Sequence, residues 1–191
     1  MYEIKELQIK GMVCNRCLST VKKELQSLGA EILELELGKV IVKYPKNSIK
    51  IENIENVLNK NDFELLIDEE SKIIEKIKLI LIKIIDDIPI VLKINLSDKL
   101  KHDLSKDYSY LSKLFSKIEG ITIEKYFIQL KIEKAKELIQ YNQLNFTEIA
   151  DELEYSSVNY LSNQFRQTTG KSMSEYKKLS LWNRKPLDKI L

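Results

Sequence analysis

An internal repeat with an offset of fifty residues is the feature that most limits how this chain can fold. Six residues recur at that offset, because Tyr110, Leu111, Ser112, Phe115, Gly120 and Tyr126 return as Tyr160, Leu161, Ser162, Phe165, Gly170 and Tyr176. In each copy the leucine and the phenylalanine are four residues apart, so both lie on the same face of a helix. Each glycine follows where that helix must end. The sequence therefore predicts two copies of one helical unit.

Each recurring helix is preceded by a shorter amphipathic helix, for which Ser97 in the first copy and Thr147 in the second are the expected N-caps. The copies then span about 96–120 and 146–170, and a long amphipathic helix over about 123–141 joins them. A short helix, a turn and a second helix, present twice, is the helix-turn-helix plan. Two such units on one rigid helix can reach adjacent major grooves of DNA, which are about 34 Å apart.

The N-terminal part of the chain has a different pattern. Residues 2–10 alternate apolar and polar side chains, which predicts a half-buried strand, and Gly11 ends it. The segments that follow are a helix, two strands joined by a turn, a second helix and a last strand, at 15–28, 31–36, 39–44, around 51–58 and 63–67. The order β-α-β-β-α-β predicts an α+β, ferredoxin-like domain with two helices on one face of an antiparallel sheet.

The domain boundary is expected near residue 69, before an apolar helix over 71–85 that Asp87-Ile88-Pro89 stops. The predicted organisation is an N-terminal domain over 1–69, an all-α domain over 70–180 and a C-terminal tail over 181–191. Residues 1–70 contain ten lysines and arginines against thirteen acidic residues, whereas residues 71–191 contain twenty-one against sixteen. The basic second half is weakly indicative of a polyanionic partner.

The composition limits where the protein works and what it does. The charged, alternating start has no apolar signal segment, and the most apolar stretch, residues 73–85, is interrupted by four charged residues, so a cytoplasmic protein without a membrane span is expected. An enzyme is not expected, because there is no phosphate-binding glycine loop, no histidine beside a nucleophile and no carboxylate cluster. The only histidine, His102, is predicted to be a surface residue.

The segment Phe146–Lys178, FTEIADELEYSSVNYLSNQFRQTTGKSMSEYKK, resembles the signature of AraC-type transcription regulators. In that family a short helix carries Ile-Ala, a second helix carries S-x-x-Y-[FL]-x-x-x-F, and G-x-[ST]-P-x-x-[YF] follows. The resemblance covers roughly residues 71–180. Two positions depart from it, because Met173 stands where proline is usual and Glu154-Tyr155 stands where Gly-Phe is usual.

The resemblance implies double-stranded DNA as the partner and assigns contact residues by position. The base-facing residues would be Ser109, Ser112 and Lys113 in the first recognition helix, and Val158, Asn159, Ser162 and Asn163 in the second. Asparagine suits adenine edges, lysine suits guanine, and valine can contact a thymine methyl group. The residues that would contact phosphates are Lys106, Lys117, Arg166 and Lys171, which add affinity but read no sequence.

Gly11-Met12-Val13-Cys14-Asn15-Arg16-Cys17 lies between the first strand and the first helix. Cys14 is expected on the loop and Cys17 on the first helical turn, where the unpaired N–H groups stabilise thiolates. In a reducing compartment, cysteines at this spacing indicate a metal or redox site before a structural disulfide. Two soft thiolates favour Cu(I), and Zn(II) or another thiophilic ion is possible.

The motif G-M-x-C-x-x-C and the surrounding element order resemble the heavy-metal-associated domain of copper chaperones and copper-transporting ATPases, over residues 1–68. In that family the residue at Met12 packs in the core and is not a ligand, and Phe63 is similar to the aromatic residue that often shields the site. Three alternatives stay open: a redox pair, an incidental pair, and a domain that has lost its metal but kept its fold.

Together these features predict a transcription regulator that responds to Cu(I) or another thiophilic ion bound by Cys14 and Cys17. A homodimer through the N-terminal domain or helix 71–85 is possible, with four thiolates sharing one ion. The alternatives are a metal-independent regulator whose N-terminal domain is a protein-interaction or dimerisation module, and a metallochaperone whose helical half docks a partner protein.

Overall fold

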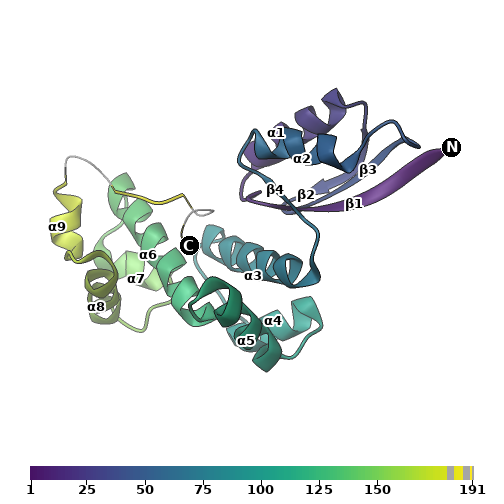
Figure 1. The fold of residues 1–191 in the computed structure, drawn as a ribbon. Coiled ribbons are helices and arrows are strands. Elements are labelled where there is room, and N and C mark those ends of the chain that lie inside the picture. The colour runs from purple at the N-terminus through teal and green to yellow at the C-terminus, as the bar shows by residue number, and fades with distance from the viewer. Residues whose placement is uncertain (180–182, 187–189, 191) are drawn as a thin grey trace. The chain divides into compact units, whose positions relative to one another are not determined.

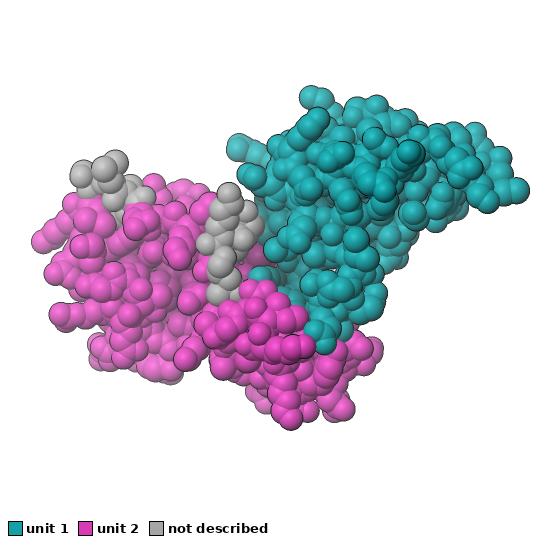
Figure 2. Space-filling view, viewed as in Figure 1, with its two compact units in different colours: residues 1–79 teal, residues 80–191 magenta. Residues whose placement is uncertain are grey.

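The computed structural model describes residues 1–179, 183–186 and 190. The predicted tail over 181–191 lies outside the described residues, except for 183–186 and 190. The chain divides into two compact units, residues 1–79 and residues 80–191, which Figure 2 colours separately. The first contains the sheet and the second is helical, as Figure 1 shows.

The first unit contains a four-stranded antiparallel sheet. Its strands are β1 (Tyr2–Lys10), β2 (Glu31–Glu36), β3 (Lys39–Pro45) and β4 (Glu64–Leu66), and helices α1 (Asn15–Ser27) and α2 (Ile51–Asn59) lie between them in sequence. The strand order is β2-β3-β1-β4, so β1 is paired on both sides. Glu6 lies opposite Ile41 of β3, and Ile9 lies opposite Leu65 of β4. The element order is the one that the sequence predicts.

The alternation of buried residues along β3 places one face of the sheet in the core. Ile9, Val40 and Val42 are fully buried there, together with Val21 of α1 and Leu58 of α2. Helices α1 and α2 cover this face in Figure 1. The antiparallel sheet with its helices is therefore an observation, whereas assignment to the ferredoxin-like class stays a prediction.

Helix α3 (Glu69–Asp86) crosses the boundary between the two units. The sequence places the boundary before this helix, whereas the compact units divide after Leu79. The physical reason is that the first part of α3 contacts the first unit. Glu75 accepts a hydrogen bond from the Gly11 N–H, and a Cβ atom on Gly38 would collide with the Leu79 side chain. The first half of α3 thus belongs to the unit that carries the cysteines.

The second unit consists of helices among its described residues. They are α4 (Leu96–Leu104), α5 (Tyr108–Glu119), α6 (Ile123–Tyr141), α7 (Phe146–Glu152), α8 (Val158–Thr169) and α9 (Met173–Lys177), preceded by the end of α3. The repeat governs their packing. The ring centroids of Phe115 and Tyr126 are 5.6 Å apart, and those of the equivalent Phe165 and Tyr176 are 5.4 Å apart. Both copies therefore bury the same aromatic pair.

The helix ends correct one prediction and confirm another. Ser97 and Thr147 are not N-caps, because α4 begins after Asn95 and α7 begins after Asn145. These asparagines are themselves fifty residues apart, but only Asn145 uses its side chain as a cap. Gly120 and Gly170 end α5 and α8 with φ of 72° and 73°, the left-handed conformation that glycine adopts without a Cβ clash.

Within the described residues, no helix is both long enough and apolar enough to cross a membrane.

Candidate nucleic-acid interface and cysteine site

Helices α5 and α8 each bury one face and present a polar face to solvent. Leu111 and Phe115 of α5 and Leu161 and Phe165 of α8 have no exposed surface, which fixes the orientation of both helices. The caps reinforce this arrangement in α8, where the Ser157 hydroxyl accepts a hydrogen bond from the Tyr160 N–H at 3.2 Å. The side chains opposite the buried pairs are therefore the ones available to a partner.

The structure keeps every predicted base-facing residue out of the core. Of the seven, the exposed residues are Ser109, Lys113, Asn159 and Asn163, and the half-buried residues are Ser112, Val158 and Ser162. All seven residues occupy positions of α5 or α8 that are not used by the buried leucine and phenylalanine of that helix. The exposure agrees with a contact surface, and the individual base contacts stay predictions.

The four predicted phosphate-contacting side chains are also exposed. Lys106 precedes α5 and Lys117 lies in its last turn, whereas Arg166 lies in the last turn of α8 and Lys171 follows that helix. The Lys106 ammonium lies 5.7 Å from the centroid of the Tyr110 ring, a distance suited to a cation–π contact. Both copies of the repeat thus carry exposed cations close to the ends of α5 and α8.

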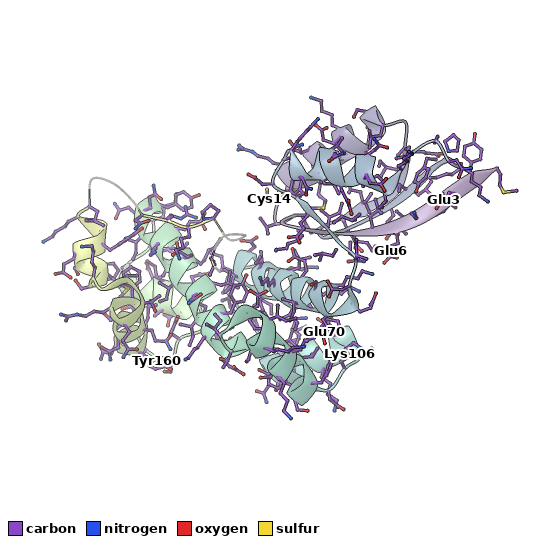
Figure 3. All side chains as sticks on the ribbon, viewed as in Figure 1. Glu3, Glu6, Cys14, Glu70, Lys106 and Tyr160 are labelled. Atoms are coloured by element: carbon purple, nitrogen blue, oxygen red, sulfur yellow. The ribbon has the colours of Figure 1, made fainter. Side chains whose placement is uncertain are left out.

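Two exposed aromatic residues belong to this surface and were not predicted as contacts. Tyr110 and Tyr160 are 44% and 53% exposed, at equivalent positions of the repeat, and Figure 3 labels Tyr160 on α8. The Tyr160 hydroxyl accepts a hydrogen bond from Gln164 at 3.2 Å, and Gln164 accepts one from Tyr155 at 2.9 Å. The sequence signal is their recurrence at equivalent positions of the repeat, although the spacing alone does not show that both rings are exposed.

The two cysteines lie side by side at the beginning of α1, where Figure 3 labels Cys14. Cys14 is the N-cap, with an extended backbone, and its Sγ atom lies 3.3 Å from the Sγ atom of Cys17. Cys14 is exposed and Cys17 is half-buried. The Cys17 thiol also lies 3.7 Å from the carbonyl oxygen of Gly11, to which it donates a hydrogen bond. The geometry brings both sulfurs to one point on the surface.

The thiols of this pair have opposite pKa shifts. Partial burial raises the pKa of Cys14, but hydrogen bonds from Cys17 and the nearby Arg16 outweigh it, so this pKa lies below its ordinary value. Burial raises the pKa of Cys17, and its hydrogen bond with Cys14 raises it further. Both shifts depend on the contact between the two sulfurs, which favours loss of the proton from Cys14 before Cys17.

The donor set in the described part of the chain is limited to these two sulfurs. No group of three or more histidine, cysteine, aspartate or glutamate side chains that could hold an ion occurs there. Met12 is fully buried, in agreement with the expected core role, and Phe63 is 8% exposed. The His102 side chain is 84% exposed, as predicted for a surface residue. Two soft donors fit a thiophilic ion such as Cu(I), whereas a structural zinc site takes four ligands.

Residues 102–179 match the family model described as a helix-turn-helix domain. This part of the chain is therefore similar to helix-turn-helix domains. A curated relative, the Msm operon regulatory protein of Streptococcus mutans, is 29% identical over 75 residues. The matched segment covers 39% of this chain and 27% of that protein, so the chain spans about a quarter of this relative's length.

Solved structures that are similar to the helical part of this chain come from several bacteria. The C-terminal domain of the two-component response regulator yesN from Fusobacterium nucleatum is 30% identical, with a TM-score of 0.47, over 55% of this chain and 96% of that one. The C-terminal domain of AraT, a response regulator from Geobacillus stearothermophilus, is 22% identical, with a TM-score of 0.49, over 58% of this chain and 88% of that one.

The two departures from the AraC pattern fall at backbone positions with special demands. Glu154, where the family has glycine, has a φ of 56° in the turn between α7 and α8. An L-residue in this left-handed conformation is strained, which explains the preference for glycine. Met173 is the first residue of α9, where proline is favoured because its N–H is not needed, and it is 2% exposed. Both departures therefore leave the helices in place.

Proposed function

We propose that this protein is a sequence-specific transcription regulator that binds double-stranded DNA through α5 and α8. The observation that carries the proposal is the duplicated packing of the AraC-type domain. Phe115–Tyr126 and Phe165–Tyr176 repeat one core contact, so the chain presents the same second helix twice. The match of residues 102–179 to the helix-turn-helix family supports the same conclusion.

The exposed residues divide into two roles under this proposal. Asn159 and Asn163 can each pair with an adenine edge, and Lys113 can pair with guanine, which provides sequence reading. Arg166 and Lys106 neutralise phosphates, which provides affinity that falls with salt but little selectivity. The modest net charge of +2 agrees with a protein that depends on both.

The test begins with selection of a preferred duplex from a random double-stranded DNA library by the full chain. Fluorescence anisotropy then compares the selected duplex with a scrambled one. We expect the double variant Asn159→Ala/Asn163→Ala to lose the preference for the selected duplex. The matched control is Asn56→Ala, because Asn56 is an exposed asparagine of α2 in the other unit. Failure to enrich any sequence, with equal affinity for all duplexes, would refute sequence-specific binding.

We further propose that the cysteine pair makes the regulator responsive to a thiophilic metal ion, with Cu(I) as the ion that the two donors favour. The support is geometric, since the sulfurs are 3.3 Å apart at the start of a helix and Cys14 is exposed to an incoming ion. Zn(II) would require further ligands, for example the two thiols of a second copy. A homodimer, formed through the first unit or through helix 71–85, would supply these further thiols.

The metal proposal is tested by anaerobic Cu(I) titration of the reduced full chain against a competing chelator. We expect tight binding that the Cys14→Ser/Cys17→Ser variant loses. Affinity for the selected duplex is then measured with and without Cu(I) in both proteins. A metal can shift DNA binding only if it interacts differently with the two states of the protein.

Wild type that binds no more Cu(I) than the double serine variant would refute the metal proposal and favour the second candidate. That candidate is a metal-independent regulator whose first unit is a protein-interaction or dimerisation module. Two features favour it: the described residues supply only two donors, and the first unit exposes Tyr2 and Ile4 on one strand, at 65% and 62%.

A further inference from the structure

Glu75 occupies an unusual place for a carboxylate. It lies in the middle of α3 and is 7% exposed, in a unit whose other buried residues are almost entirely apolar. Its Oε1 atom accepts a hydrogen bond of 3.0 Å from the Gly11 N–H. A buried carboxylate is stable only when its oxygens have partners, so this contact is a determinant of how α3 packs.

Gly11 is the residue at which the cysteine loop meets α3. Its N–H group is bound by Glu75, and its carbonyl oxygen accepts the hydrogen bond of the Cys17 thiol at 3.7 Å. A side chain cannot replace this glycine easily, because φ is 89° and a Cβ atom would lie 3.3 Å from the Asp62 carbonyl oxygen. One peptide segment therefore joins Cys17 on one side to Glu75 on the other.

A second contact holds the same part of α3. A Cβ atom on Gly38, in the turn between β2 and β3, would collide with Leu79, so this helix and the turn approach closely. Glu75 and Leu79 are four residues apart and lie on one face of α3. The same helix continues without interruption to Asp86, seven residues into the unit that contains the AraC-type domain.

We infer that Glu75 is a positioning residue that couples the state of the cysteine pair to helix α3. The Gly11 peptide lies between the two groups, because its carbonyl oxygen is 3.7 Å from the Cys17 sulfur and its N–H group is bound by Glu75. Glu75 holds this peptide in the position in which the loop presents both sulfurs to one ion, so ion binding and the packing of α3 are linked through it. This inference rests on the proposed metal response, and it names the residue through which that response leaves the first unit.

The variants separate coupling from simple destabilisation. Glu75→Gln keeps an acceptor for the Gly11 N–H, whereas Glu75→Met has a similar shape without one. Leu79→Ala weakens the same helix contact without touching the loop. By reciprocity, a residue that couples the two sites must also change the affinity for the ion. We expect Glu75→Met to weaken Cu(I) binding about three- to tenfold, the equivalent of one hydrogen bond, and Glu75→Gln to restore it.

The experiment uses the full, reduced chain and needs no DNA. Cu(I) affinity is measured against a competing chelator, and amide hydrogen exchange of Gly11 and of residues 76–82 is measured with and without Cu(I). We expect Cu(I) to change exchange along α3 in wild type and Glu75→Gln, and to change it much less in Glu75→Met and Leu79→Ala. Thermal melts establish that each variant is folded.

The outcomes distinguish this inference from the function on which it rests. Equal Cu(I) affinities in folded wild type, Glu75→Gln and Glu75→Met, with no copper-dependent change along α3, would overturn the coupling and leave the metal site intact. No Cu(I) binding by wild type would overturn the metal response, and the coupling with it. Faster hydrogen exchange of the Gly11 amide in Glu75→Met than in wild type and Glu75→Gln, together with weaker Cu(I) binding, would support the coupling.

Discussion

Replacement of Asn145 by alanine tests whether the second helix-turn-helix is held at its entrance by a side-chain cap. The Asn145 Oδ1 atom accepts hydrogen bonds from the N–H groups of Thr147 at 2.9 Å and Glu148 at 3.0 Å. In return, the Glu148 carboxylate accepts a hydrogen bond from the Asn145 N–H at 2.7 Å. Loss of such a capping box lowers the free energy of unfolding by about 1–2 kcal/mol.

The repeat offers a matched control at the equivalent position. Asn95 precedes α4 as Asn145 precedes α7, but its side chain makes no capping hydrogen bond. We therefore expect Asn95→Ala to change the free energy of unfolding by less than about 0.5 kcal/mol. Thr147→Ala provides the second control, because Thr147 lies inside α7 and contributes only its backbone N–H to the cap.

The assay is urea and thermal unfolding of the full chain, followed by circular dichroism at helical wavelengths. For a domain about as large as the helical unit, each kcal/mol of unfolding free energy corresponds to a shift of about 4–8 °C in the midpoint of the thermal transition. Asn145→Ala should therefore melt measurably earlier than both controls. Equal midpoints for Asn95→Ala and Asn145→Ala, or a larger loss for Thr147→Ala, would refute the reasoning.

Three further predictions concern the turn and the DNA surface. Glu154→Gly should raise the free energy of unfolding by about 1 kcal/mol relative to Glu154→Ala, because only glycine relieves the left-handed backbone; equal stabilities in denaturant titrations would contradict this. Arg166→Gln should reduce the slope of log affinity against log salt by about 0.9, whereas Lys22→Gln in α1 should not change it. Asn159→Ala should weaken discrimination at a single base position by about 1–3 kcal/mol, and uniform weakening across duplexes would assign this residue to the backbone instead.

The repeat made the helical half of this protein predictable. Identical spacing of Leu111 and Phe115, and of Leu161 and Phe165, fixes which face of each helix is buried, because side chains four apart share a face. The glycines that follow fix where both helices end. Strand β3 was equally predictable, since its buried residues Val40, Val42 and Tyr44 occupy alternate positions and therefore share one face.

The candidate sites were predictable to different degrees. The spacing of Cys14 and Cys17 was sufficient to place both thiols at a helix start, because the sequence separation is short and the local geometry is nearly fixed. The exposure of Asn159 and Asn163 followed from the same periodicity. The role of Tyr110 and Tyr160 as exposed rings was missed, because a tyrosine beside a buried leucine can face either way until the neighbouring helices are in place.

The sequence by itself determined the order of elements, the repeated helical unit and the proximity of the two cysteines. Each of these depends on residues that are close together along the chain. The tertiary structure decided which asparagine caps a helix, and it assigned half of α3 to the first unit. It also brought Glu75 to Gly11, sixty-four positions away. Such contacts depend on how separate elements pack, and no local pattern specifies the orientation of one element against another.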